Sequence, residues 1–158
     1  AAGGRSLMKW NHTEKVDGAV KIIDPVKVVK LEPGPSGWTE TLVAELQDQQ
    51  CRFLLPVDVE GDGSKELVAA GFKNGLYLLR PQEDGTFAVE TIDANSSGFE
   101  HATHAADLDG DGKQELYVAA DNQGEVRRYT WNGTGFDRKV IAKIGPSHIT
   151  WNIQDGVF

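Results

Sequence analysis

Residues 106–116, ADLDGDGKQEL, place carboxylates at every second position with glycines between them, directly before an apolar run. This alternation lets several carboxylates converge on one point, and Gly112 permits the sharp turn that brings a later acid back toward the first three. Hard oxygen ligands in this number suit Ca²⁺. The ligands that the spacing predicts are Asp107, Asp109, Asp111, the Lys113 carbonyl and Glu115.

A second acidic loop, DVEGDGSKEL, has the same spacing and also precedes an apolar run. Glu60 stands where Asp is expected, and its extra methylene strains the ligand geometry or places a water between carboxylate and metal. Without a cation, the carboxylates of either loop would repel one another; the alternative for both loops is an exposed turn rich in Asp and Gly. The ligands predicted here are Asp58, Glu60, Asp62, the Ser64 carbonyl and Glu66.

The two loops belong to a longer repeat, because Asp107 lies 49 residues after Asp58 and the same offset relates Phe136 to Phe87. Short runs rich in Val, Leu, Ile, Tyr and Phe, bounded by Gly, Asn or Asp, predict four strands in each repeat. The repeats span about 50–97 and 98–146, with a fainter copy at about 5–49. The segment HITWNI resembles the opening LMKWN and predicts an extra strand at 147–153.

Four-stranded antiparallel units with this period predict an all-β chain of β-propeller blades, about three blades plus the extra strand, in one domain over 1–158. Three blades do not close a ring, since closed propellers have roughly four to eight. The chain is therefore a piece of a longer propeller, or other chains complete the ring. A third possibility is a structural subunit that polymerises through HITWNI.

Composition excludes several classes of protein. The formal net charge of −8 argues against a nucleic-acid binder, because phosphate contacts require clustered Lys and Arg. It fits a protein that holds cations or one that stays soluble through its charge. The single cysteine, Cys51, excludes an internal disulfide and a cysteine-based zinc site, and no apolar run is long enough to span a membrane.

The pattern DxDGDGxxEL, followed by a short apolar strand and repeated after 49 residues, resembles the FG-GAP/VCBS repeat family, the calcium-loop blades of integrin-α-like propellers. The resemblance covers residues 50–145 more closely than 5–49. It implies a calcium-binding module for recognition or assembly, with a protein, a glycan, other blades or copies of the chain as partner. Together with the availability of calcium, it implies a location outside the cytoplasm.

The same resemblance leaves an enzyme as the alternative, and whether the chain is an enzyme stays undecided. Lyases and dehydratases of the family that this chain resembles act on sugars with His, Tyr and Arg residues at the mouth of the propeller channel. The repeat aligns His101 with Arg52 and roughly with His148, which predicts a ring of polar groups, with His101 or His104 as a candidate base. Packing through hydrogen bonds is the other interpretation of these histidines. His101 and His104 point to opposite faces of a strand and do not chelate one metal.

Aromatic side chains suggest one further contact. Trp131 stands beside the turn residues Asn132 and Gly133 and is predicted to be exposed, as a candidate for ligand binding. Trp10 and Trp151 are expected to pack between blades.

Overall fold

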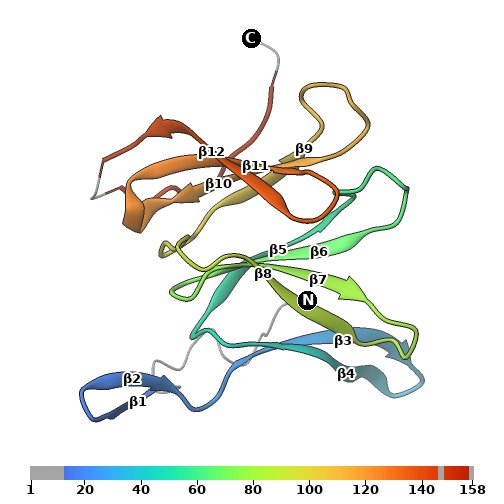
Figure 1. Cartoon of the computed structure of the whole chain (residues 1–158). Helices are drawn as coiled ribbons and strands as arrows, with labels where there is room; N and C mark the ends of the chain where they lie inside the picture. The colour runs from blue at the N-terminus through green and yellow to red at the C-terminus, as the bar shows by residue number, and fades with distance from the viewer. Residues whose placement is uncertain (1–12, 146–147, 157–158) are drawn as a thin grey trace.

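The computed structural model describes residues 13–145 and 148–156, and this part of the chain is all-β (Figure 1). The N-terminal strands are β1 (Thr13–Val16), β2 (Ala19–Ile22), β3 (Val26–Gly34) and β4 (Gly37–Leu46). The next four are β5 (Cys51–Val57), β6 (Glu66–Gly71), β7 (Leu76–Pro81) and β8 (Phe87–Asp93). The last four are β9 (Thr103–Ala106), β10 (Glu115–Ala120), β11 (Glu125–Trp131) and β12 (Phe136–Lys143), with the 3₁₀ turn η1 (Asp121–Gln123) before β11.

Two antiparallel four-stranded sheets form the main body, and in each one the strands lie in chain order, β5-β6-β7-β8 and β9-β10-β11-β12. The hairpin β3-β4, the β5–β8 sheet and the β9–β12 sheet are stacked one above another (Figure 1). The prediction of four-stranded antiparallel blades is confirmed for these two units. The sheets do not close into a ring in the described residues.

Both faces of the central strands β6 and β7 are buried, which follows from their apolar runs ELVAAG and LYLL. Successive side chains of a strand point to opposite faces. Ala69 accordingly packs in the cluster with β3 and β4, and Leu67 packs against that cluster. Val68 and Ala70 pack in the cluster shared with the β9–β12 sheet. Each large apolar side chain buried here contributes roughly 2 kcal/mol to the free energy of folding.

The N-terminal unit differs from the expected four-stranded blade. It forms two separate two-stranded sheets, β1-β2 and β3-β4. Pro25 stands between β2 and β3 and has no N–H to donate to a ladder, which favours the break between the two hairpins. The strand expected at LMKWN falls on residues 7–11, outside the described part of the chain.

The extra strand expected at 147–153 is not found in its described portion, because residues 148–156 form no strand. A strand needs a backbone ladder with a neighbour, whereas this segment is attached by side chains. The backbone N–H and the hydroxyl of Thr150 both donate to the Asp121 carboxylate, each at 2.8 Å. Asp155 contacts His104 Nε2 at 2.8 Å. The repeat boundaries and the single domain stay predictions.

A contact that the motif did not predict connects each sheet to the segment before it. Asp48, fully buried, accepts backbone N–H groups from Lys73 at 3.1 Å and Asn74 at 2.7 Å in the β6–β7 turn. Ser97, 49 residues later, accepts the N–H of Asn122 at 3.1 Å through its carbonyl and the Asn122 side chain at 3.0 Å. The repeat therefore preserves, besides the acidic loop, a hydrogen-bonded contact between the segment before each sheet and the turn between the second and third strands of that sheet.

We expect Asp48→Ala to lower the free energy of unfolding by about 3 kcal/mol, because hydrogen bonds to a charged acceptor are strong and their donors would be left without partners. Urea denaturation followed by tryptophan fluorescence measures the change. Asp48→Asn keeps one acceptor oxygen and should cost clearly less. Equal stability of the Ala variant and the wild type would contradict this role.

Candidate metal centre and the neighbouring loop

The loop between β9 and β10 is organised around one aspartate. The Asp107 carboxylate accepts backbone N–H groups from Gly110 at 2.8 Å, Asp111 at 3.1 Å and Gly112 at 3.0 Å. Asp111 in turn accepts the N–H of Lys113 at 2.9 Å. Gly110 and Gly112 have φ angles of 76° and 89°, in the left-handed region that side chains disfavour. The glycines of the motif therefore serve the turn.

This turn brings four predicted ligands together. One carboxylate oxygen from each of four residues lies within 4.8 Å of the others, and the four could hold a metal ion. Three of these side chains are exposed and the fourth is buried. The four residues are Asp107, Asp109, Asp111 and Glu115. The Lys113 carbonyl stays a predicted ligand.

Glu115, at the start of β10, is the buried member of the cluster, with 1% of its surface exposed. Its Oε2 accepts the backbone N–H of Leu108 at 3.2 Å and the hydroxyl of Tyr117 at 3.0 Å. Burial, and then the bond to Glu115, raises the pKa of Tyr117 to about 12. Oε1 of Glu115 is buried and has no hydrogen-bond partner among the described residues. Such an atom is costly unless a cation satisfies it, so the donor set fits a metal ion.

The loop between β5 and β6 repeats the same backbone arrangement. The Asp58 carboxylate accepts the N–H groups of Gly61 at 2.7 Å, Asp62 at 3.1 Å and Gly63 at 2.9 Å. The N–H of Ser64 donates to Asp62 at 2.8 Å. The two loops therefore have the same pattern of hydrogen bonds between the main chain and the aspartates.

Their side chains differ, because an arginine of β7 reaches into the loop between β5 and β6. Nη1 of Arg80 lies 2.7 Å from Glu60 Oε1 and 3.2 Å from Glu66 Oε1, while its Nε donates to Glu90 at 3.1 Å. Two of the ligands predicted for a metal are thus bound to a guanidinium. The sequence signal for this arrangement was Glu60, which departs from the aspartate pattern.

The two loops touch each other at one edge of the stack, the right side of Figure 1. The N–H of Asp58 donates to Gln114 Oε1 at 2.9 Å, and the N–H of Gln114 donates to the Asp58 carbonyl at 3.0 Å. A Cβ added at Gly61 would lie 2.8 Å from the Gly112 carbonyl oxygen, so a side chain there would collide with the neighbouring backbone. The two loops are therefore in direct contact.

His101 is enclosed between the two sheets rather than placed at an open channel. It is fully buried, with Nδ1 2.6 Å from the Gly71 carbonyl and Nε2 2.7 Å from Ser96 Oγ. A carbonyl only accepts, so Nδ1 carries the proton and Nε2 accepts from the hydroxyl. Burial lowers the pKa of His101 to about 4. The neutral ring thus ties the segment before β9 to the end of β6.

The other residues of the expected polar ring have partners of their own. Arg52 pairs with Glu100 at 2.8 Å and stacks on the Phe99 ring at 4.5 Å. His104 contacts Asp155, as described above, and His148 is exposed. Within residues 13–145 and 148–156, no hydrogen bond or ion pair joins Arg52, His101 and His148 to one another.

Trp131 is half-buried, which differs from its expected exposure. Its ring meets Phe136 edge-on at 5.3 Å, and the Arg80 guanidinium lies 5.0 Å from its centroid. It lines a crevice between the two sheets together with Leu78 and Glu90. Trp151 is 67% exposed, contrary to its expected packing, and Trp10 lies outside the described residues.

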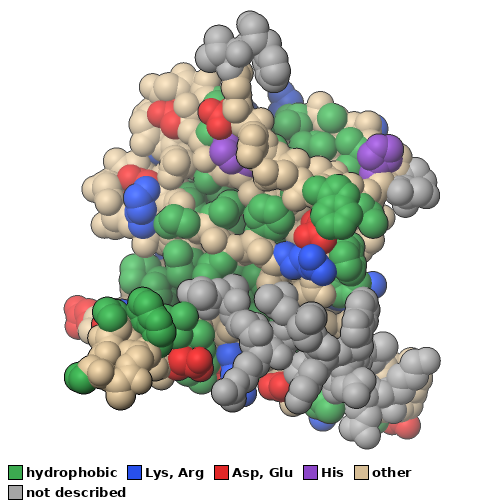
Figure 2. Space-filling model, turned by 180° about the vertical axis from the view of Figure 1, so that it is seen from behind, with side chains coloured by type: hydrophobic (Ala, Val, Ile, Leu, Met, Phe, Trp, Pro, Cys, Tyr) green, Lys and Arg blue, Asp and Glu red, His purple; other side chains and the backbone are tan. Residues whose placement is uncertain are grey.

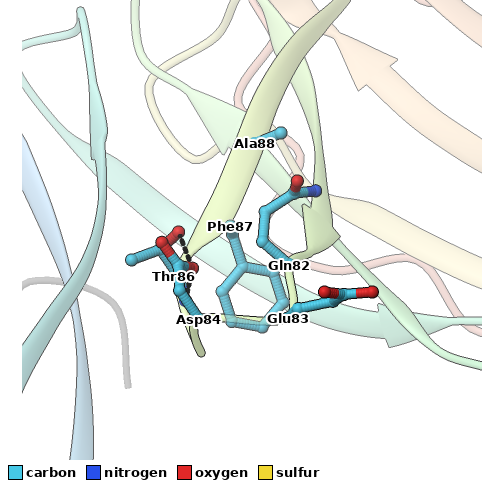
Figure 3. Close-up of a pocket in the computed structure, with 6 residues that line it drawn as sticks. All are labelled: Gln82, Glu83, Asp84, Thr86, Phe87 and Ala88. Atoms are coloured by element: carbon cyan, nitrogen blue, oxygen red, sulfur yellow. Dashed lines mark hydrogen bonds between the residues drawn. The ribbon is translucent and has the colours of Figure 1, made fainter.

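A second hollow lies at the β7–β8 turn and is lined by residues of the turn and of the start of β8, namely Gln82, Glu83, Asp84, Thr86, Phe87 and Ala88 (Figure 3). The N–H and hydroxyl of Thr86 donate to Asp84 Oδ1 at 2.9 and 2.6 Å. These bonds stabilise the turn. The side chains lie along the surface and do not converge on a common point (Figure 3). The hollow offers no set of converging catalytic groups.

Comparison with known families agrees with the geometry of the loops. Residues 58–118, which run from the first acidic loop into β10, match the family model of the FG-GAP-like repeat. This segment is an FG-GAP-like repeat. The resemblance noted from the sequence is thereby confirmed over the matched residues. The chain matches none of the curated proteins and none of the solved structures with which it was compared.

The segment that matches the FG-GAP-like repeat covers both acidic loops, the strands β6 to β9 and the first part of β10. With the antiparallel sheets of the structure, it indicates a β-propeller-like recognition module. In the described part of the chain, no helix is both long enough and apolar enough to cross a membrane.

The buried His101 makes stability depend on pH. The pKa of His101 in the folded state, about 4, lies below the ordinary histidine value of 6.5, so between these pH values the unfolded chain binds a proton at this residue and the folded chain does not. The resulting stability is present above pH 6.5 and is lost as the pH falls toward 4. We expect this residue alone to cost about 2 kcal/mol between pH 7 and pH 5.

Urea denaturation of the wild type and of His101→Asn at both pH values checks this expectation. Asn tolerates the positive φ of 52° at this position, and the variant should be less stable at pH 7 but lose less on acidification. His104→Gln, at a histidine that is not fully buried, serves as the control. An identical pH dependence in the wild type and His101→Asn would contradict the assignment.

Proposed function

We propose that the chain is a calcium-binding FG-GAP-like module of propeller type, which serves recognition or assembly outside the cytoplasm. The single observation that carries the metal is the buried Oε1 of Glu115, which lacks a partner beside three exposed carboxylates. A cation between these groups would satisfy that atom and offset the repulsion of four negative charges.

The donor set favours calcium over magnesium. Carboxylates on a flexible loop, with a backbone carbonyl as a further ligand, suit the larger ion and its variable coordination. Magnesium demands near-ideal octahedral geometry and retains several waters. Extracellular calcium modules bind at about 10⁻⁴ to 10⁻³ M, and a site of that affinity would be occupied only outside the cytoplasm.

The ion's role in this proposal is structural. It would connect the end of β9 to the start of β10 through Asp107 and Glu115. Because the loop touches Asp58 of the preceding sheet, the ion would also stiffen the junction between the two sheets. A rigid edge of this kind presents a defined surface to a partner.

A protein or a glycan is the proposed partner. Apolar side chains form a broad band across the middle of the rear face, with charged side chains beside it (Figure 2). Among the described residues, Trp38 and Trp151 are 70% and 67% exposed, and exposed aromatic rings are typical of binding surfaces. Trp131, half-buried against Arg80, is less suited to this role than these two.

The enzymatic alternative has less support. A base must reach substrate, whereas His101 is fully buried with both ring nitrogens engaged. His104 is bound to Asp155 at 2.8 Å. The proposed function therefore uses neither histidine.

We expect calcium to stabilise the wild type by about 2.7 kcal/mol at a free concentration one hundred times the dissociation constant. Asp109→Asn removes one exposed ligand and should weaken binding at least tenfold and abolish most of this stabilisation. Isothermal titration with CaCl₂, and urea denaturation with and without chelator, measure the two effects.

Glu83→Gln is the matched control, since it removes the same charge from an exposed turn that lies outside both acidic loops. It should bind calcium like the wild type. Identical urea curves of the wild type with calcium and with chelator would contradict the proposed metal site. Equal loss of binding in both variants would point to a general charge effect instead of ligation.

A further inference from the structure

We propose that Arg80 is the resident cation of the 58–66 loop, so that this loop closes without a metal ion and calcium binding is confined to the 107–115 loop. The inference rests on the proposed function for the 107–115 loop. It concerns a difference between two copies of one motif, which the spacing of the acids does not reveal.

The strand register shows why only one loop receives an arginine. Leu67 pairs with Leu79 across β6 and β7, so Glu66 and Arg80 are the next residues facing each other at the loop end. Leu116 pairs with Tyr129 in the later sheet, and Thr130 therefore stands opposite Glu115. A threonine is too short and carries no charge to neutralise the acids of the 107–115 loop.

The guanidinium is held on several sides. Besides its contacts with Glu60, Glu66 and Glu90, it lies over the Trp131 ring of the following sheet. An arginine presents several donors in a rigid fork and stacks on aromatic rings, which suits this environment better than the flexible ammonium of a lysine. The Arg80 side chain is 23% exposed and that of Glu66 is 8% exposed, so water weakens these contacts only in part.

Glu60 is the second residue, after Arg80, that distinguishes the 58–66 loop from the 107–115 loop. In the 107–115 loop its place is taken by Asp109, whose shorter side chain joins the carboxylate cluster. The longer Glu60 reaches Arg80 Nη1 at 2.7 Å. The departure from the aspartate pattern and the arginine on β7 are therefore one feature, a pair of changes that replaces an ion by a side chain.

A metal ion would compete with Arg80 for the same carboxylates. Glu60 and Glu66 are the third and ninth positions of the motif, and two cations at these oxygens would repel each other. Oε2 of Glu66, like Oε1 of Glu115, is buried without a hydrogen-bond partner among the described residues, but there the acids of the 58–66 loop do not form a cluster close enough to hold a metal ion. Removal of the guanidinium would expose a nearly complete metal loop, with Asp58 and Asp62 already in place.

The test is a calcium titration of variants that restore the motif. Arg80→Thr combined with Glu60→Asp gives the 58–66 loop the residues that the 107–115 loop has at the corresponding positions. We expect one calcium ion per chain for the wild type, two for this double variant and one for the double variant carrying Asp109→Asn. Arg138→Thr removes another arginine, one that pairs with Asp93, and should remain at one ion.

Each outcome decides between the possibilities. Two ions in the wild type, lost singly by Asp109→Asn and Asp62→Asn, would overturn the proposal. A folded double variant that still binds one ion would also overturn it. If the wild type binds none, the proposed function fails, while a gain of one ion in the double variant would still uphold the role of Arg80.

Hydrogen exchange of the wild type tests the same idea without a variant. On addition of chelator, the amides of Gly110 and Gly112 should lose protection at least tenfold. Those of Gly61 and Gly63 should keep it, because Arg80 remains in their loop. Equal loss of protection in both loops would overturn the proposal.

Discussion

Burial of both faces of β6 and β7, the central strands of the β5–β8 sheet, is the constraint on which the rest of the structure depends. Val68 and Leu78 face the following sheet, whereas Ala69 and Leu79 face the preceding hairpin. A sheet covered on both sides fixes the order of the stack and the register of its strands. The acidic loops, the linker contacts and His101 all occupy the margins that this stacking brings together.

At those margins, polar side chains accept hydrogen bonds from turn backbone, which apolar packing cannot provide. Asp48 and Ser97 satisfy the turns at one edge, and Asp58 and Asp107 gather backbone N–H groups at the other. Asp48 and Ser97 are buried, and buried polar groups need partners, so the linker margin is specified residue by residue. The repeat is consequently visible in polar residues as clearly as in apolar ones.

The turns of the acidic loops follow from the sequence, because the spacing of acids and glycines directly determines a local turn, whereas the metal ligands stay a prediction. The sequence predicted the strands of the two later units for the same reason, through alternation and turn residues. Arg80 escaped prediction because its partners Glu60 and Glu66 are distant in sequence and meet it only after β6 and β7 pair. The buried position of His101 was not predicted either, because its partner, the backbone carbonyl of Gly71, leaves no signal in the sequence.

The position of Trp131 has a consequence for how the chain is made. The ring that covers Arg80 belongs to the following sheet and leaves the ribosome after the whole β5–β8 sheet. A nascent chain that ends before β11 therefore holds its guanidinium against carboxylates alone, open to water on one side. Domains fold as they are synthesised, and the arrival of the later sheet completes the earlier one. Completion of the β5–β8 sheet thus depends on the sheet that follows it.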